Sequence, residues 1–140
     1  MTVCLDTNAV LQLFGRRSPL APLKDALFDG RVRLALSTAV LLEYEEVVVE
    51  YASRERWNSI AEFFDLLELV RGTVVKVSPS FQFGVIAADP DDNKFADCAI
   101  TANADFVITE DRHFAPLASA GYRPQPITPT EFIRRYLVPA

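Results

Sequence analysis

The chain has 140 residues, of which half are hydrophobic and about a quarter are charged, so it suits a single globular domain. Two cysteines and one histidine are too few for a disulfide framework or a His/Cys zinc site. A net charge of −5 argues against general nucleic-acid binding, unless the acids gather in a site that metal ions neutralise. Because we find no signal peptide and no apolar run of membrane length, we expect a cytoplasmic protein.

Short apolar runs alternate with segments of helical periodicity along the chain. In chain order, we expect a strand at 3–5, a helix at 19–29, a strand at 32–36, helices at 38–51 and 54–70, a strand at 73–77, a loop at 78–88, a helix at 90–103, a strand at 105–109, a short helix at 114–118, a strand at 126–128 and a helix at 130–137. This alternation predicts an α/β fold of three layers, in which helices cover both faces of a mainly parallel sheet of about five strands. Ligands of such sheets bind beyond the carboxyl ends of the strands.

Two aspartates follow predicted strands at this edge of the sheet. Asp6 comes directly after the first strand, and Asp111 comes shortly after the strand that ends near Thr109. Each aspartate alone is equally well explained by an Asx-turn or a helix cap. Two of them, on strands that can be neighbours, favour a shared site.

Further acids open the helix expected at 90–103. The segment 89–92 (Asp-Pro-Asp-Asp) suits a helix start, with its first aspartate as N-cap and Asp92 at the third helical position. Favourable interaction with the helix dipole explains these acids without any chemistry. Asp92 shares a helical face with Ala96 and Ala99, so we expect it at a closely packed edge, and Asp97 lies one turn further on.

Glu43 lies in the first two turns of the helix expected at 38–51. Its spacing with Glu46 and Glu50 also describes a solvated helix face, but Glu43 is the nearest of the three to the predicted ligand edge. Like charges about 4 Å apart repel by ~4 kcal/mol near a protein surface, so a cluster of these acids would need cations. Carboxylates suit Mg²⁺ or Mn²⁺, and such ions can activate water for attack on a phosphodiester.

Four segments together resemble, in order, the motifs of the PIN-domain family. They are 3–8 (Val-Cys-Leu-Asp-Thr-Asn), 37–44 with its glutamate early in a helix, 89–95 (Asp-Pro-Asp-Asp-Asn-Lys-Phe) and 104–111 (Ala-Asp-Phe-Val-Ile-Thr-Glu-Asp). The third segment has the form that this motif takes in bacterial toxin components. The resemblance runs from about residue 2 to 135 and implies a PIN-like α/β nuclease fold.

The resemblance also implies roles for individual residues. The catalytic acids, which would also be the Mg²⁺ or Mn²⁺ ligands, would be Asp6, Glu43, Asp92 and Asp111. Asn8 and Thr109 would support them through hydrogen bonds, and Asp97 would be a fifth acid. Asp91 fits the third motif as well as Asp92 does. Glu110 departs from the family, since many relatives have a small residue or glycine there.

Relatives of this kind are commonly ribonucleases, often toxins of toxin–antitoxin pairs. The resemblance therefore implies an RNA substrate, a small antitoxin protein as partner, and a homodimer.

Four cationic residues flank the acidic motifs and are candidates for holding RNA phosphates: Arg16, Arg17, Lys94 and Arg112. Each alone is equally well explained as solvated surface charge. His113 could act as a proton shuttle, although hydrolysis with two metal ions does not require one. The apolar segment 81–86 is either a partner interface or a loop folded onto the core.

Two other functions are compatible with parts of the pattern. One is a phosphoryl-transfer domain with Asp6 as nucleophile, but Asn8 stands where such enzymes use a second aspartate. The other is a catalytically silent PIN-like domain that binds RNA or protein. The presence of all four expected acids argues against it.

Overall fold

The computed structural model describes residues 1–80, 83–84, 86 and 92–138. In this part of the chain, five strands form one sheet in the order β3–β2–β1–β4–β5, and every pairing is parallel. The strands are β1 (Thr2–Leu5), β2 (Arg33–Leu36), β3 (Val74–Lys76), β4 (Phe106–Ile108) and β5 (Gln125–Ile127). The predicted α/β class with a parallel five-stranded sheet is confirmed.

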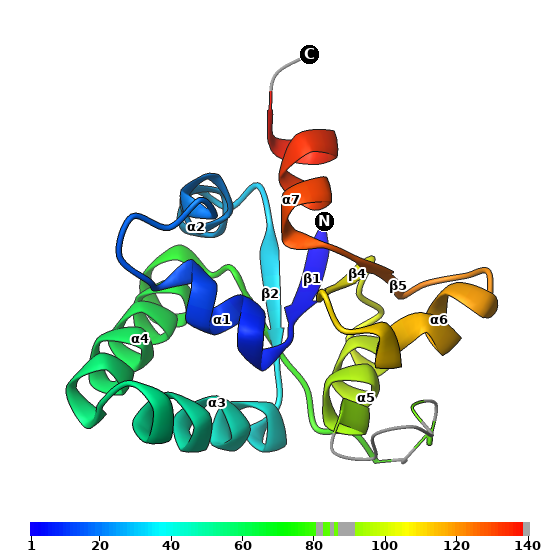
Figure 1. The fold of residues 1–140 in the computed structure, drawn as a ribbon, viewed down its shortest axis with the longest axis horizontal. Helices are drawn as coiled ribbons and strands as arrows, with labels where there is room; N and C mark the ends of the chain where they lie inside the picture. Colours follow the sequence, from blue (N-terminus) through cyan, green and yellow to red (C-terminus); the bar gives the residue numbers. More distant parts are fainter. Residues whose placement is uncertain (81–82, 85, 87–91, 139–140) are drawn as a thin grey trace.

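Helices fill the connections between the strands (Figure 1). In chain order they are α1 (Thr7–Leu13), α2 (Ala21–Asp29), α3 (Thr38–Tyr51), α4 (Arg54–Leu66) with a π-helical extension (Leu67–Arg71), α5 (Asn93–Thr101), a 3₁₀ turn (Arg112–Phe114) leading into α6 (Ala115–Ser119), and α7 (Pro129–Phe132) with a second π-helical extension (Ile133–Leu137). None of the described helices is long and apolar enough to cross a membrane.

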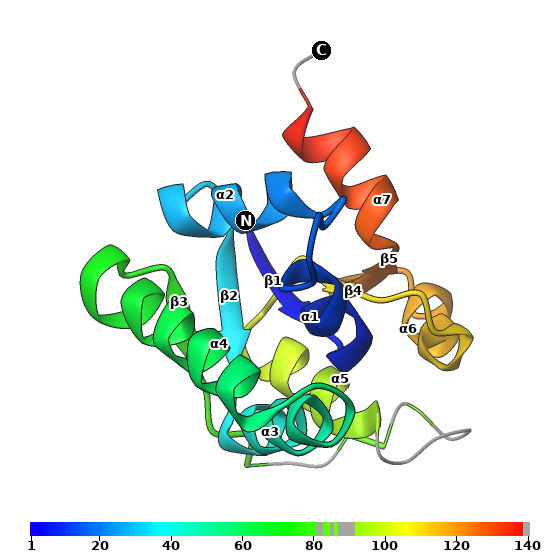
Figure 2. The ribbon, with the colours of Figure 1, turned by 60° about the vertical axis from the view of Figure 1, so that its left-hand side comes forward.

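The path of the chain explains why helices cover both faces of the sheet. The chain runs outward from β1 through β2 to β3, and then returns to the other side of β1 as β4 and β5. Right-handed crossovers in opposite directions place their helices on opposite faces. Figures 1 and 2 show the resulting layers. Strand order therefore reverses between β1 and β4, which is where ligands of such sheets bind.

Buried aromatic contacts hold the end of β1 in place. Val3, Cys4 and Leu5 are completely buried, as expected for a central parallel strand covered on both faces. The Tyr44 hydroxyl of α3 donates a hydrogen bond to the Leu5 carbonyl, and its ring stacks on Phe95 of α5 at 6.0 Å between centroids. Helices α3 and α5 thus meet directly beneath the residue that follows β1.

The helix α1 was not predicted. Asp6 caps it, because its Oδ1 accepts a hydrogen bond of 2.8 Å from the Ala9 backbone N–H. The helix has only seven residues, which is too short for apolar periodicity to show in the sequence. Arg16 and Arg17 lie in the following loop, as expected.

Most of the other boundaries differ from those predicted by one to three residues, and two of these differences lie close to the expected site or at the last strand. Helix α5 begins at Asn93, and Asp92 lies in a 3₁₀ turn directly before it. Because residues 89–91 lie outside the described part, the expected position of Asp92 in the first helical turn stays a prediction. Strand β5 begins one residue earlier than expected. In the apolar segment, Ile86 is fully buried and Phe83 is 46% exposed, whereas Phe81 and Val85 lie outside the described residues.

We predict that Leu34→Ala lowers the free energy of unfolding by about 2–5 kcal/mol, because it removes a fully buried side chain from β2 and leaves a cavity. Leu69→Ala is the matched control, since Leu69 is 80% exposed, and it should change the value by less than about 0.5 kcal/mol. Urea unfolding measures both. Similar effects of the two substitutions would contradict the description of this core.

Candidate functional site

Asp6 is the most deeply buried of the predicted catalytic acids, with 5% of its surface exposed. It follows β1 directly, and its backbone N–H continues the sheet ladder by donating to the Ile108 carbonyl of β4 at 3.2 Å. Its two carboxylate oxygens have separate partners: Oδ1 accepts from the Ala9 N–H, and Oδ2 accepts from the Thr109 hydroxyl. Its position and orientation are therefore fixed by β4 and α1 together.

Thr109 connects Asp6 to Asp111. Its hydroxyl donates to Asp6 and accepts a hydrogen bond of 2.9 Å from the Asp111 backbone N–H. The same residue thus orders the ends of two neighbouring strands. Thr109 is 4% exposed, so water does not compete for these bonds.

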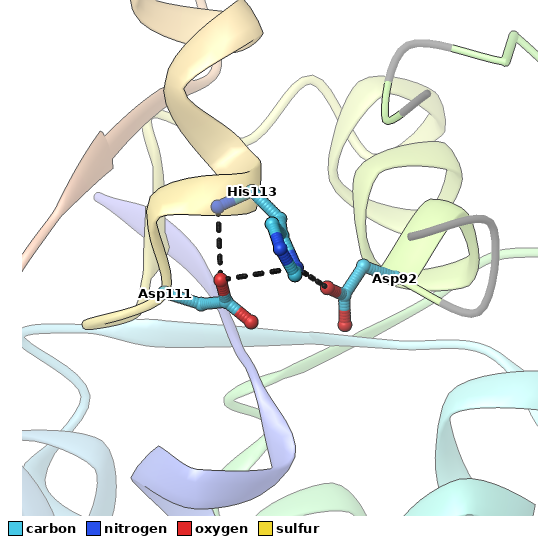
Figure 3. Close-up of side chains that lie close together, drawn as sticks. All are labelled: Asp92, Asp111 and His113. Carbon is cyan, nitrogen blue, oxygen red and sulfur yellow. Dashed lines mark hydrogen bonds and ion pairs between the residues drawn. The ribbon is translucent and has the colours of Figure 1, made fainter. Parts of the chain in front are cut away.

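Asp92, Asp111 and His113 form a second part of the same centre (Figure 3). The His113 Nδ1 lies 3.3 Å from Asp111 Oδ1 and 3.6 Å from Asp92 Oδ2, so the imidazole stands between the two carboxylates. Asp111 also accepts a hydrogen bond of 2.8 Å from the His113 backbone N–H, which caps the 3₁₀ turn. Two acids, one directly before α5 and the other three residues after β4, are thereby brought together.

Glu43 forms an ion pair with Lys94. Its Oε2 lies 3.2 Å from Lys94 Nζ, and both side chains are about three-quarters buried. Lys94 is two residues beyond Asp92, so this pair lies at the start of α5, beside the aspartate centre. Lys94, a predicted RNA-binding residue, is thus held by Glu43, a predicted catalytic acid.

Asp97 lies deeper along α5 and is 8% exposed. Its Oδ1 accepts a hydrogen bond of 3.0 Å from the Phe83 backbone N–H. With Lys94 and Ser37 it lines a cavity of about 360 Å³ beyond the ends of β2 and β3. It therefore faces a different space from Asp6.

The remaining predicted residues are exposed. Asn8 lies on α1 and lines a cavity together with Asp6 and Asp111. Arg112 follows Asp111 directly, while Arg16 and Arg17 lie in the loop after α1; within the described part of the chain, these three arginines form no ion pair. All three are accessible to a solvent-borne anion.

Burial raises the pKa of the Asp6 carboxyl above its ordinary value of 3.8. Hydrogen bonds from Thr109 and Ala9 oppose this effect, whereas the negative charges of Asp111 and Glu110 add to it. The folded protein therefore favours the ionised form of Asp6 less than water does, and a nearby cation would offset this effect.

The donor set fits a divalent cation. One ligand atom from each of Asp92, Asp111 and His113 lies within 4.8 Å of the others. Carboxylate oxygens suit Mg²⁺ and Mn²⁺, and an imidazole nitrogen is acceptable to Mn²⁺. Asp6 adds a buried negative charge behind them, connected through Thr109.

Two residues at this site are only weakly indicated by the sequence. His113 has a ring that lies between Asp92 and Asp111, although its sequence position indicates no more than a proton shuttle. Glu110 departs from the residue type of many relatives, and it lines the cavity beside Asp6. The signal for both is that they lie within two residues of Asp111 in the sequence.

The fold and the site together define a class of protein, an α/β domain with a carboxylate centre at the point where the strand order reverses. The family model described as "PIN domain" matches residues 2–113, which include all four motifs. The chain belongs to the PIN-domain family, as its sequence indicated.

A solved structure supports the fold. A chain in the structure of VapBC-1 from nontypeable Haemophilus influenzae is similar to this one, with a TM-score of 0.57 and 19% sequence identity over 93% of this chain and 99% of that chain. At this identity the likeness concerns the fold alone. No match was found among curated proteins.

We predict that Asp6→Asn raises the free energy of unfolding at pH 7 in the presence of EDTA. A raised folded-state pKa means that the folded protein favours the protonated acid, so ionised Asp6 opposes folding above that pKa. As the pH falls through the raised pKa towards 3.8, wild-type Asp6 becomes neutral and the difference should shrink.

Denaturant unfolding between pH 7 and pH 4 measures this difference, with the exposed Asp25→Asn on α2 as control. The control should stay within about 0.5 kcal/mol of wild type. A less stable Asp6→Asn protein at pH 7, or a difference that grows on acidification, would contradict the electrostatic account.

Proposed function

We propose that this protein is a Mg²⁺- or Mn²⁺-dependent endoribonuclease that hydrolyses RNA phosphodiester bonds. The observation that carries the proposal is the hydrogen-bonded path from Asp6 through Thr109 to Asp111, which the His113 ring extends to Asp92. Such a path gathers acids that are far apart in the chain at one edge of the sheet. Membership of the PIN-domain family supports the same activity.

In this proposal Asp92 and Asp111 hold the cation, and Asp6 adds charge and order behind them. A bound divalent cation supplies neutralisation of the phosphodiester charge and activation of water. Thr109 keeps Asp6 and the Asp111 backbone in register. The His113 Nδ1 can carry a proton between the two carboxylates that it contacts. When a cation is bound, the ring would either become a further ligand of the cation or turn away from it.

Positive groups beside this centre would receive the RNA backbone. Lys94 is already oriented by Glu43, so its ammonium group is positioned at the start of α5. Arg16, Arg17 and Arg112 are exposed and can contact phosphates further along the strand. Glu43 then serves first to position Lys94, and its direct ligation of a cation remains part of the proposal.

We also propose that the protein is a cytoplasmic toxin that forms a homodimer and is neutralised by a small antitoxin. The sequence resemblance to bacterial toxin components supports this, and so does the likeness to a VapBC-1 chain. Leu42 and Tyr51 of α3 are exposed and offer apolar surface for a partner.

Light scattering of the purified protein should give twice the mass of one chain. The product of a neighbouring small gene should co-purify with the protein.

We predict that Asp111→Asn abolishes RNA cleavage while the protein stays folded, because it removes one of the carboxylates that face His113. Wild-type cleavage of a panel of RNAs should require Mg²⁺ or Mn²⁺ and stop with EDTA. In a thermal melt, Mn²⁺ should stabilise wild type more than Asp111→Asn. The control is Glu46→Gln, an exposed position on α3.

Full activity of folded Asp111→Asn would contradict the assignment. RNA binding without cleavage in Mn²⁺ would favour a silent PIN-like module. Trapping of an aspartyl-phosphate analogue on Asp6 would favour a phosphoryl-transfer domain.

We predict that Thr109→Val lowers the cleavage rate by about 10–100-fold, because it removes both hydrogen bonds that connect Asp6 and Asp111. Thr109→Ser retains the hydroxyl and should keep most of the activity. Single-turnover cleavage at saturating Mn²⁺ separates this loss from weaker metal binding. Equal rates for the two variants would show that the hydroxyl does not position the acids.

A further inference from the structure

A cavity of about 310 Å³ opens beside the aspartate centre, between α1, the end of β4 and the start of α7. It shares Asp6 and Asp111 with that centre. Its other walls include Asn8, Leu11, Gln12, Glu110 and Pro129. Asn8 is also expected to support the catalytic acids, whereas cation binding and the proposed hydrolysis explain none of the other four.

The lining of this cavity combines three carboxylates with neutral amides and apolar side chains, and this mixture suits an uncharged ring that carries hydrogen-bond donors. Leu11 and Pro129 are apolar, and Asn8 and Gln12 carry neutral amides at positions i and i+4 of α1. The three carboxylates can face a cation, but the apolar side chains and the amides extend the cavity beyond a cation site, and such mixed walls are typical of small-molecule sites. The volume is at the lower end of such sites, ~300–1,000 Å³.

Charge decides which part of an RNA strand can enter. Glu110 is exposed, and its negative charge adds to those of Asp6 and Asp111 on the same cavity. A phosphate group would be repelled there unless the cation of the aspartate centre lay next to it. A base is neutral, and single-stranded RNA presents unstacked bases to proteins in this way.

Glu110 also discriminates among the bases. A carboxylate only accepts hydrogen bonds. Guanine carries two donors side by side, the ring N1–H and the exocyclic amino group, which match the two carboxylate oxygens. In adenine, cytosine and uracil, each donor adjoins an acceptor that a carboxylate would repel.

We infer that this cavity binds the guanine base next to the scissile phosphate, with Glu110 as the specificity-determining residue. The inference rests on the proposed ribonuclease function for the placement of the phosphate at the aspartate centre. Gln12 and Asn8 can donate to the remaining acceptors of the base, while Leu11 and Pro129 cover its faces.

The test compares two short single-stranded RNAs of uridines, one with a central guanosine and the other with a central inosine, which lacks the exocyclic amino group. Binding is measured by fluorescence anisotropy with Ca²⁺ in place of Mg²⁺. Wild type should bind the guanosine RNA about tenfold more tightly. In Glu110→Ala this ratio should fall to within about twofold, and in the control Glu62→Gln, an exposed position on α4, it should persist.

A second readout is Mn²⁺ affinity without RNA, measured by calorimetry, which Glu110→Ala should leave within about twofold of wild type. An unchanged guanosine-to-inosine ratio in Glu110→Ala, or no preference in wild type, would overturn the inference. A more than tenfold loss of Mn²⁺ affinity would assign Glu110 to the metal and overturn it as well. Cleavage in Mn²⁺ is scored separately, so absence of cleavage with an intact, Glu110-dependent ratio would reject the ribonuclease and retain the guanine site.

Discussion

The parallel pairing of β1 with β4 is the constraint on which the site depends. In the observed register Val3 lies opposite Phe106, Cys4 opposite Val107 and Leu5 opposite Ile108. Asp6 and Thr109 therefore emerge from the sheet side by side, although they are 103 residues apart in the sequence. A slip of one residue would turn Asp6 to the other face and separate it from the Thr109 hydroxyl. The apolar core that fixes this register thus also fixes the position of Asp6 relative to Thr109.

Electrostatic repulsion at the centre works against that packing. Asp6 is buried close to Asp111 and Glu110, and its raised pKa reflects this environment. The chain offsets part of the unfavourable energy with local hydrogen bonds, from the Ala9 N–H to Asp6 and from the His113 N–H to Asp111. Sites that carry out chemistry often retain such unfavourable groups, and the surrounding core stabilises the fold. A bound cation would reduce the repulsion between these carboxylates, which the packing of the sheet does not reduce.

Most of the sheet could be predicted from sequence because parallel strands buried on both faces are continuous apolar runs. The edge at which Asp6 and Asp111 meet followed from the same pattern, because the carboxyl ends of parallel strands point the same way. The helix α1 could not be predicted, since seven residues do not complete two helical turns of apolar pattern. Side-chain partners were equally hidden: nothing in local spacing indicates that Glu43 pairs with Lys94, because that contact depends on how α3 packs against α5.

The residues around Asp111 differ in charge from one side to the other, and this difference suggests how a strand would lie. On the α5 side, Lys94 offers an ammonium group that Glu43 positions. On the α1 side, Glu110 adds negative charge to a cavity with apolar walls. A polyanion with neutral bases satisfies both sides if its backbone approaches Lys94 while a base turns towards the cavity beside α1. The negative net charge of the protein is compatible with an RNA substrate on this basis, since the acids would face the cation and the base, and the phosphates would face lysine and arginine.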